Sequence, residues 1–124
     1  MIKDGAIIYD YLKERSSSER KSHSADGAPT IGERNALRSA KSYLDVMAFS
    51  RSGLIEQLEY EGYTSAEAAY AVDACGADWY EQAVRSAHSY LSIMSFSKSG
   101  LIDQLEYDGF TYDQAVYGVT QNGY

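Results

Sequence analysis

The sequence has few of the features that cross-link a small protein or anchor it in a membrane. Among its 124 residues there is one cysteine, Cys75, so no disulfide bond can form within the chain. No stretch approaches the roughly 18 to 20 apolar residues that span a bilayer. The apolar run Ala6–Ile8 lies between Asp4 and Asp10, which excludes the hydrophobic region of a signal peptide.

Phenylalanine and tryptophan are also scarce. The chain has three phenylalanines and one tryptophan against twelve tyrosines. Because tyrosine is amphipathic, this composition suits thin cores close to the surface. The length permits one ordinary domain or two very small ones. A unit of about 40 residues is at the lower limit of independent stability, so a small unit would need stabilising contacts with a neighbour or a partner.

Positive charge is missing from most of the chain. Lys and Arg total 11 against 18 Asp and Glu, which gives a formal net charge of -7. Residues 1–35 are balanced, so the whole net charge lies on residues 36–124. No Lys or Arg occurs from Ser52 to Val84 or after Lys98. Such a surface repels phosphate backbones and favours basic partners, so we expect no nucleic-acid partner.

Residues that usually carry catalysis or hold metals are few and poorly placed. The two histidines are His23 and His88, and the second becomes Lys41 in the repeat described below. Neither lies at a metal-binding spacing from Cys75, and the chain has no nucleophile elbow or phosphate-binding loop. We therefore expect no enzymatic activity and no catalytic, cofactor-binding or metal-binding residues.

The dominant feature that is present is an internal duplication. Ala36–Ala77 aligns without a gap with Ala83–Tyr124, and more than half of the aligned positions are identical. The clearest match is FSRSGLIEQLEYEGYT at residues 49–64 against FSKSGLIDQLEYDGFT at residues 96–111. The sequence therefore predicts two helical repeats, residues 36–77 and 78–124, after a polar, Ser-rich and flexible N-terminal segment, residues 1–35.

Each repeat is predicted to contain three helices. In the first helix of each copy, apolar residues recur at spacings of three and four, which is the period of one helical face. These residues are Leu37, Ala40, Tyr43, Leu44 and Met47, and then Val84, Ala87, Tyr90, Leu91 and Met94. We expect an all-α fold of two tandem helix-turn-helix-like repeats with a short linker.

Turn residues separate the predicted helices. We interpret the Ser50–Gly53 turn as a hydroxyl cap for a second helix at Leu54–Glu61. Gly62 then has the place of a left-handed C-terminal cap. Thr64 and Glu67 have the spacing of a capping box that begins the third helix. The equivalent residues of the second copy are Gly109, Thr111 and Gln114.

The repeated motif resembles a known family. Phe-Ser-x-Ser-Gly-Leu-Ile-x-Gln-Leu-Glu-Tyr-x-Gly, then Tyr or Phe and Thr, occurs in both copies. The motif resembles the host cell surface-exposed lipoproteins and, more narrowly, is similar to the Ltp-type superinfection-exclusion lipoproteins of prophages in Gram-positive bacteria. Residues 1–35 lie outside the resemblance.

The resemblance implies a location and a function. It implies a protein tethered by an N-terminal lipid to the outer face of the cytoplasmic membrane, where it stops phage DNA from entering by binding the phage tape measure protein. No cysteine lies near the start of the chain, and Cys75 is replaced by Asn122 in the second copy. We expect this chain to be a soluble, monomeric ectodomain that contacts membrane only through such an anchor.

A helix-turn-helix arrangement also invites a DNA-binding interpretation, with the third helix in the major groove. However, residues 64–74 and 111–121 contain no Lys or Arg. Neutralising phosphates supplies much of the affinity for DNA, so this interpretation is disfavoured.

The predicted contact surface is the end of the second helix in each copy, where tyrosine and carboxylates alternate. Tyrosines anchor interfaces, and acids select basic or polar partners. The alternative is a solvated helix end whose tyrosine covers the core. The predicted partner-binding residues are Glu59, Tyr60, Glu61, Glu106, Tyr107 and Asp108. Two functions remain open: phage exclusion, and a general cell-surface adhesion or protein-interaction module without a phage role.

Overall fold

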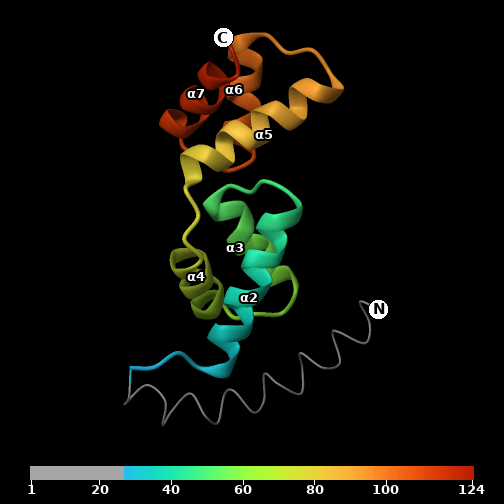
Figure 1. The fold of residues 1–124 in the computed structure, drawn as a ribbon. Coiled ribbons are helices and arrows are strands. Elements are labelled where there is room, and N and C mark those ends of the chain that lie inside the picture. Colours follow the sequence, from blue (N-terminus) through green and yellow to red (C-terminus); the bar gives the residue numbers. More distant parts are fainter. Residues whose placement is uncertain (1–26) are drawn as a thin grey trace. The chain divides into compact units, whose positions relative to one another are not determined.

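The structure is a computed structural model that describes residues 27–124, and this range contains six α-helices and no strand (Figure 1). In chain order the helices are α2 (Ile31–Val46), α3 (Arg51–Tyr60), α4 (Ser65–Ala74), α5 (Trp79–Ile93), α6 (Lys98–Tyr107) and α7 (Tyr112–Gln121). Three helices fall in each copy, so the predicted all-α class and the duplicated three-helix pattern are confirmed. Residues 1–26 of the predicted flexible segment lie outside the described residues.

Helix α2 begins earlier than the apolar period predicted. The hydroxyl of Thr30 accepts a 3.0 Å hydrogen bond from the N–H of Glu33, and the Glu33 carboxylate accepts one of 2.9 Å from the N–H of Thr30. This reciprocal pair is a capping box, and it starts the helix at Ile31. Residues 31–35, predicted to be flexible, are therefore helical. The spacing of Thr30 and Glu33 is the sequence signal that predicts this earlier start.

The predicted caps between the helices are present. In each copy a threonine hydroxyl accepts from the N–H three residues on, and the side chain of that residue accepts from the threonine N–H. The pairs are Thr64 with Glu67 and Thr111 with Gln114. Gly62 and Gly109 end the preceding helices with φ values of +112° and +108°, which side-chain-bearing residues rarely adopt.

The described residues group into two compact units, and each has its own core. Unit 1 consists of residues 27–41 and 55–75 within the described range. Its buried apolar residues are mostly small, which permits close helix packing. They are Ala36, Ala40, Leu58, Tyr63, Ala68, Ala71 and Val72. In addition, Glu67 of α4 is buried and lies directly against Gly32 of α2. A Cβ atom added to Gly32 would overlap the Glu67 carboxylate.

Unit 2 consists of residues 42–54 and 76–124. Helices α5, α6 and α7 pack around its core, and Figure 1 shows the three helices side by side. The core residues are Ala83, Ala87, Leu101, Leu105, Phe110, Ala115 and Val119. Helices α5 and α7 approach closely because Gly118 faces Ala83; an added Cβ would lie 2.6 Å from the Ala83 carbonyl.

The predicted apolar stripe is wrong at its last member in both copies. Met47 and Met94 are 53% and 55% exposed. Helices α2 and α5 end one residue earlier, at Val46 and Ile93, and Met94 has an extended backbone. The helical period does not continue past the last helical residue, so it could not place these side chains in a core.

Candidate partner-binding surface

Tyr60 and Tyr107 project into solvent at the ends of α3 and α6. Each is 87% exposed. The cause is the helical rotation of roughly 100° per residue: Leu58 is fully buried, and Tyr60 lies about 200° further round. The same holds for Leu105 and Tyr107. Neither ring covers the core, so that part of the alternative is wrong, while partner binding at these helix ends stays a prediction.

The acids that precede these tyrosines differ in how they are held. Glu59 and Glu106 are both exposed. The Ser65 hydroxyl donates a 2.7 Å hydrogen bond to Oε2 of Glu59. In the second copy Tyr112 replaces Ser65, and within residues 27–124 the Glu106 carboxylate has no hydrogen bond. The Glu106 carboxylate is therefore the more available of the two.

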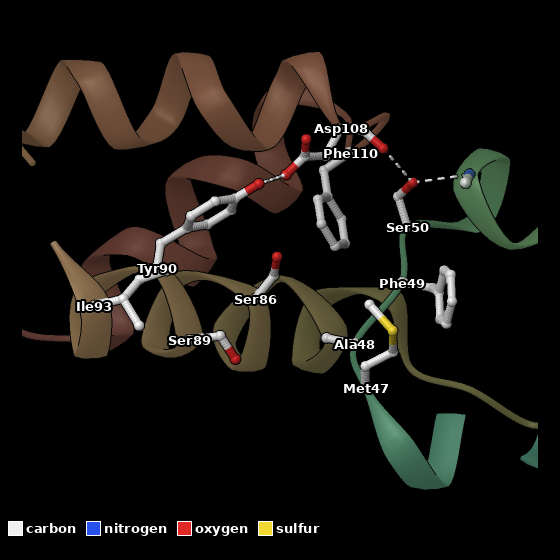
Figure 2. Close-up of a pocket in the computed structure, with 11 residues that line it drawn as sticks. Met47, Ala48, Phe49, Ser50, Ser86, Ser89, Tyr90, Ile93, Asp108 and Phe110 are labelled. Atoms are coloured by element: carbon white, nitrogen blue, oxygen red, sulfur yellow. Dashed lines mark hydrogen bonds between the residues drawn. The ribbon is translucent and has the colours of Figure 1, made fainter. Parts of the chain in front are cut away.

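The acids that follow the tyrosines, Glu61 and Asp108, are half-buried. The Asp108 carboxylate accepts a 2.6 Å hydrogen bond from the Tyr90 hydroxyl (Figure 2). It also accepts one of 3.1 Å from Nε2 of Gln104. Burial, followed by this hydrogen bond and the negative charge of Asp108, raises the pKa of Tyr90 to about 12. The structure thus holds the Asp108 side chain inward, whereas Tyr107 beside it points outward.

The acidic residues lie where a helix tolerates them least. The C-terminal end of a helix carries a partial negative charge, and an acid there is unfavourable by about 0.3–1 kcal/mol at low ionic strength. Neither α3 nor α6 has a basic residue in its last turn. Both copies break the same stability rule at the same place. Such a departure is expected where a surface serves binding.

Unit 2 also contains a pocket of about 370 Å³ (Figure 2). This volume falls in the range of sites for small ligands or for protruding side chains. Met47, Ile93 and Phe110 give it a largely apolar lining, while Ser86 and Ser89 from α5 add hydroxyl groups. The pocket therefore suits an apolar group better than a charged one.

Ser50 and Ser52 have a role that the sequence analysis missed. The Ser50 hydroxyl accepts a 2.9 Å hydrogen bond from the N–H of Gly53, as the predicted helix cap requires. The same hydroxyl also donates to the carbonyl of Asp108 at 2.7 Å, and the Ser52 hydroxyl donates to the carbonyl of Gly109 at 3.2 Å. The second serine, Ser52, was the available signal, because a cap requires only one hydroxyl; no local pattern indicates the second bond of Ser50.

Other candidate features give no site. Among residues 27–124 no cluster of three or more His, Cys, Asp or Glu side chains is arranged to hold a metal ion. His88 is exposed on α5, and Cys75 is half-buried with its thiol directed to the carbonyl of Val72. No helix in the described range has the length and apolar character needed to cross a membrane.

These features define a small all-α protein built from a duplicated three-helix module with acidic, tyrosine-bearing helix ends. The chain belongs to the host cell surface-exposed lipoprotein family, whose model matches residues 33–74 and 78–121, once in each copy. The resemblance found in the sequence is thereby confirmed. This is a family of surface-exposed lipoproteins and not of enzymes.

A solved structure supports the assignment. It is that of Ltp, a superinfection exclusion protein from the Streptococcus thermophilus temperate phage TP-J34. The two share 33% sequence identity with a TM-score of 0.70, over 75% of this chain and 96% of that chain. No curated protein sequence matches this chain.

Proposed function

We propose that this protein excludes superinfecting phages by blocking the entry of phage DNA into a Gram-positive host cell. The observation that carries the proposal is the match to Ltp, a superinfection exclusion protein, at 33% identity over 96% of its structure. The family of host cell surface-exposed lipoproteins supports a location on the outer face of the cytoplasmic membrane, behind an N-terminal lipid anchor.

The proposed mechanism is capture of a phage protein, with no bond made or broken. The partner is the phage tape measure protein, bound through basic segments. The net charge of -7 and the acidic ends of α3 and α6 support a basic partner, since complementary charge speeds encounter and selects partners.

The proposed contact residues divide into two kinds. Tyr60 and Tyr107, each 87% exposed, are the anchors, and the exposed Glu59 and Glu106 make direct contacts. Exposed aromatic rings bury a large area at small entropic cost, which suits them to this role. The half-buried Glu61 and Asp108 add negative potential around the tyrosines.

The first experiment displays the chain through a lipid anchor on a phage-sensitive Gram-positive host. Phage adsorption and the entry of labelled phage DNA are measured separately. We expect normal adsorption and strongly reduced DNA entry. Unchanged DNA entry with verified surface display would overturn the proposal and leave the general adhesion module as the better explanation.

The second experiment tests the partner and the surface together. The purified chain is titrated with purified tape measure protein at increasing salt. We expect binding that weakens with salt and is lost in Glu59→Lys/Glu106→Lys, because exposed charge pairs are screened. The matched control, Asp45→Lys/Asp113→Lys, makes the same change in net charge at exposed positions on α2 and α7. Equal losses in both variants would show that net charge alone governs binding.

A further inference from the structure

Within unit 2, the turn between α2 and α3 contacts the surface formed by α5 and the Asp108–Gly109 turn. Besides the two serine bonds to the Asp108–Gly109 turn, the N–H of Phe49 donates to Oε1 of Gln82 at 3.0 Å, and Nη1 of Arg85 donates to the carbonyl of Leu44 at 3.2 Å. Ser50 is only 3% exposed as a result. This contact joins a presenting turn from the first copy to a receiving surface in the second.

Because the chain is a duplication, it carries each of these surfaces twice. The second presenting turn is Phe96–Gly100, also in unit 2. Ser97 accepts a 3.0 Å hydrogen bond from the N–H of Gly100, as Ser50 does from Gly53. Unlike Ser50, both Ser97 and Ser99 are exposed, and within residues 27–124 neither hydroxyl donates a hydrogen bond. This turn therefore presents two hydroxyl donors that have no acceptor in the part of the chain that the structure describes.

The second receiving surface lies in unit 1. Arg38 aligns with Arg85, and Asn35 supplies an amide where the second copy has Gln82. Arg38 is exposed and has no hydrogen bond to the rest of the described chain. Gly62 aligns with Gly109 and has the same left-handed backbone, with φ of +112°.

The two glycines differ in what lies over them. A Cβ atom added to Gly109 would overlap the Ser52 hydroxyl and lie 2.6 Å from that of Ser50. The same atom added to Gly62 would meet nothing within 4 Å among the described residues. The turn at Gly62 therefore has the shape of the receiving surface without the serines that cover it.

We propose that a second copy of this chain occupies this place, with the Phe96–Gly100 turn of one molecule bound to Arg38 and the Gly62 turn of the next. Repeat proteins bury such faces against neighbouring repeats and need altered end repeats to stop the series. Here the Phe96–Gly100 turn and the surface around Arg38 and Gly62 keep the types of residue that form the contact within unit 2. The interface is heterologous, so molecules associate head to tail, in an open series or a closed ring. The inference is independent of phage exclusion.

We expect the association to be weak, because the contact comprises few hydrogen bonds. The second presenting turn differs from the first in one contact, because Tyr124 aligns with Ala77 of the first copy. The Tyr124 hydroxyl donates to the carbonyl of Phe96, which leaves the Phe96 N–H that the proposed contact uses. That N–H has no hydrogen bond within the described residues.

The test is a complementation experiment on the full chain by sedimentation equilibrium. Ser99→Asp places a carboxylate against the receiving carbonyls, and Arg38→Glu removes the receiving donor. We expect the average mass of the wild type to rise with concentration and that of each variant alone to stay at the monomer. An equimolar mixture of the variants should form dimers and nothing larger, since each retains one intact face. Lys41→Glu, also exposed on α2, is the matched control and should behave as wild type.

Nuclear magnetic resonance locates the contact on the same samples. As concentration rises, the amide signals of Ser97, Ser99 and Gly62 should shift, while those of Ser50 and Gly109 should not, because their contact is already made. A wild type that stays monomeric up to about 1 mM overturns the proposal. A mixture of the two variants that stays monomeric, or shifts that fall elsewhere, also overturns it.

Discussion

The hydroxyl of Tyr90 lies 2.6 Å from Oδ2 of Asp108, and this hydrogen bond ties α5 to the turn that follows α6. The same turn supplies the carbonyl that accepts from Ser50. Loss of the Tyr90 proton would place two negative charges side by side in a half-buried position. Burial of the ring and the neighbouring carboxylate therefore raise the pKa of Tyr90 from 10.0 to about 12.

The first prediction concerns stability at alkaline pH. Because the folded pKa of Tyr90 exceeds its unfolded value of 10.0, the folded protein keeps this proton to higher pH. The contribution of Tyr90 to the free energy of unfolding is complete below pH 10 and is lost as the pH rises toward 12. Urea unfolding across this window should show a smaller loss of stability in Tyr90→Phe than in the wild type. Equal losses of stability in Tyr90→Phe and the wild type would contradict the raised pKa of Tyr90.

The second prediction separates stability from binding at the exposed tyrosines. Tyr60→Ala and Tyr107→Ala each remove a ring that is 87% exposed, so the free energy of unfolding should change by less than about 0.5 kcal/mol. If the rings anchor the partner, each change should weaken tape measure binding roughly tenfold. Comparison of the single variants shows whether both copies bind. If both variants bound as tightly as the wild type, the tyrosines would not be part of the interface.

The third prediction concerns the helix-end acids. Glu106→Gln should stabilise the protein by about 0.3–1 kcal/mol at low salt, since it removes a negative charge from the end of α6, and the gain should shrink as salt is added. Glu59→Gln should stabilise less, because the change also weakens a charge-assisted bond from Ser65. Thermal unfolding of the two variants at low and high salt measures both effects. A loss of stability in Glu106→Gln would show that this carboxylate has a structural role.

Local patterns in the sequence predicted most of the fold. Capping boxes and glycine caps depend on residues three or four positions apart, so Thr64, Gly62 and their counterparts could be assigned without tertiary information. The outward direction of Tyr60 also follows from the helical period once Leu58 is placed in the core. Where a local pattern was overlooked, at Thr30, the boundary of α2 was predicted too late.

Contacts between distant residues could not be predicted in the same way. Nothing in the neighbourhood of Asp108 indicates that Tyr90 binds its carboxylate, because the contact requires the packing of α5 against the end of α6. The acidic residues therefore looked equivalent in sequence, although Glu106 is exposed and Asp108 is held inward. The second bond of Ser50 is likewise a tertiary contact, and the local sequence indicates only the cap that the same hydroxyl forms.

The last prediction uses a position at which the two copies differ. Gly118 on α7 aligns with Ala71 on α4, and both are buried. An alanine at position 118 would place its Cβ 2.6 Å from the carbonyl of Ala83, so α5 and α7 would have to separate. Overpacking of this kind costs about 1–3 kcal/mol, and the better helix propensity of alanine offsets at most about 1 kcal/mol.

Gly118→Ala should therefore lower the free energy of unfolding despite being a helix-favouring change, with urea unfolding as the measurement. Ala71→Gly is the matched control. It should also destabilise, but through lost helix propensity and a lost buried methyl group rather than through a clash. If Gly118→Ala were as stable as the wild type, α5 and α7 could not approach as closely as the structure shows. The difference between the copies would then be neutral rather than a consequence of helix packing.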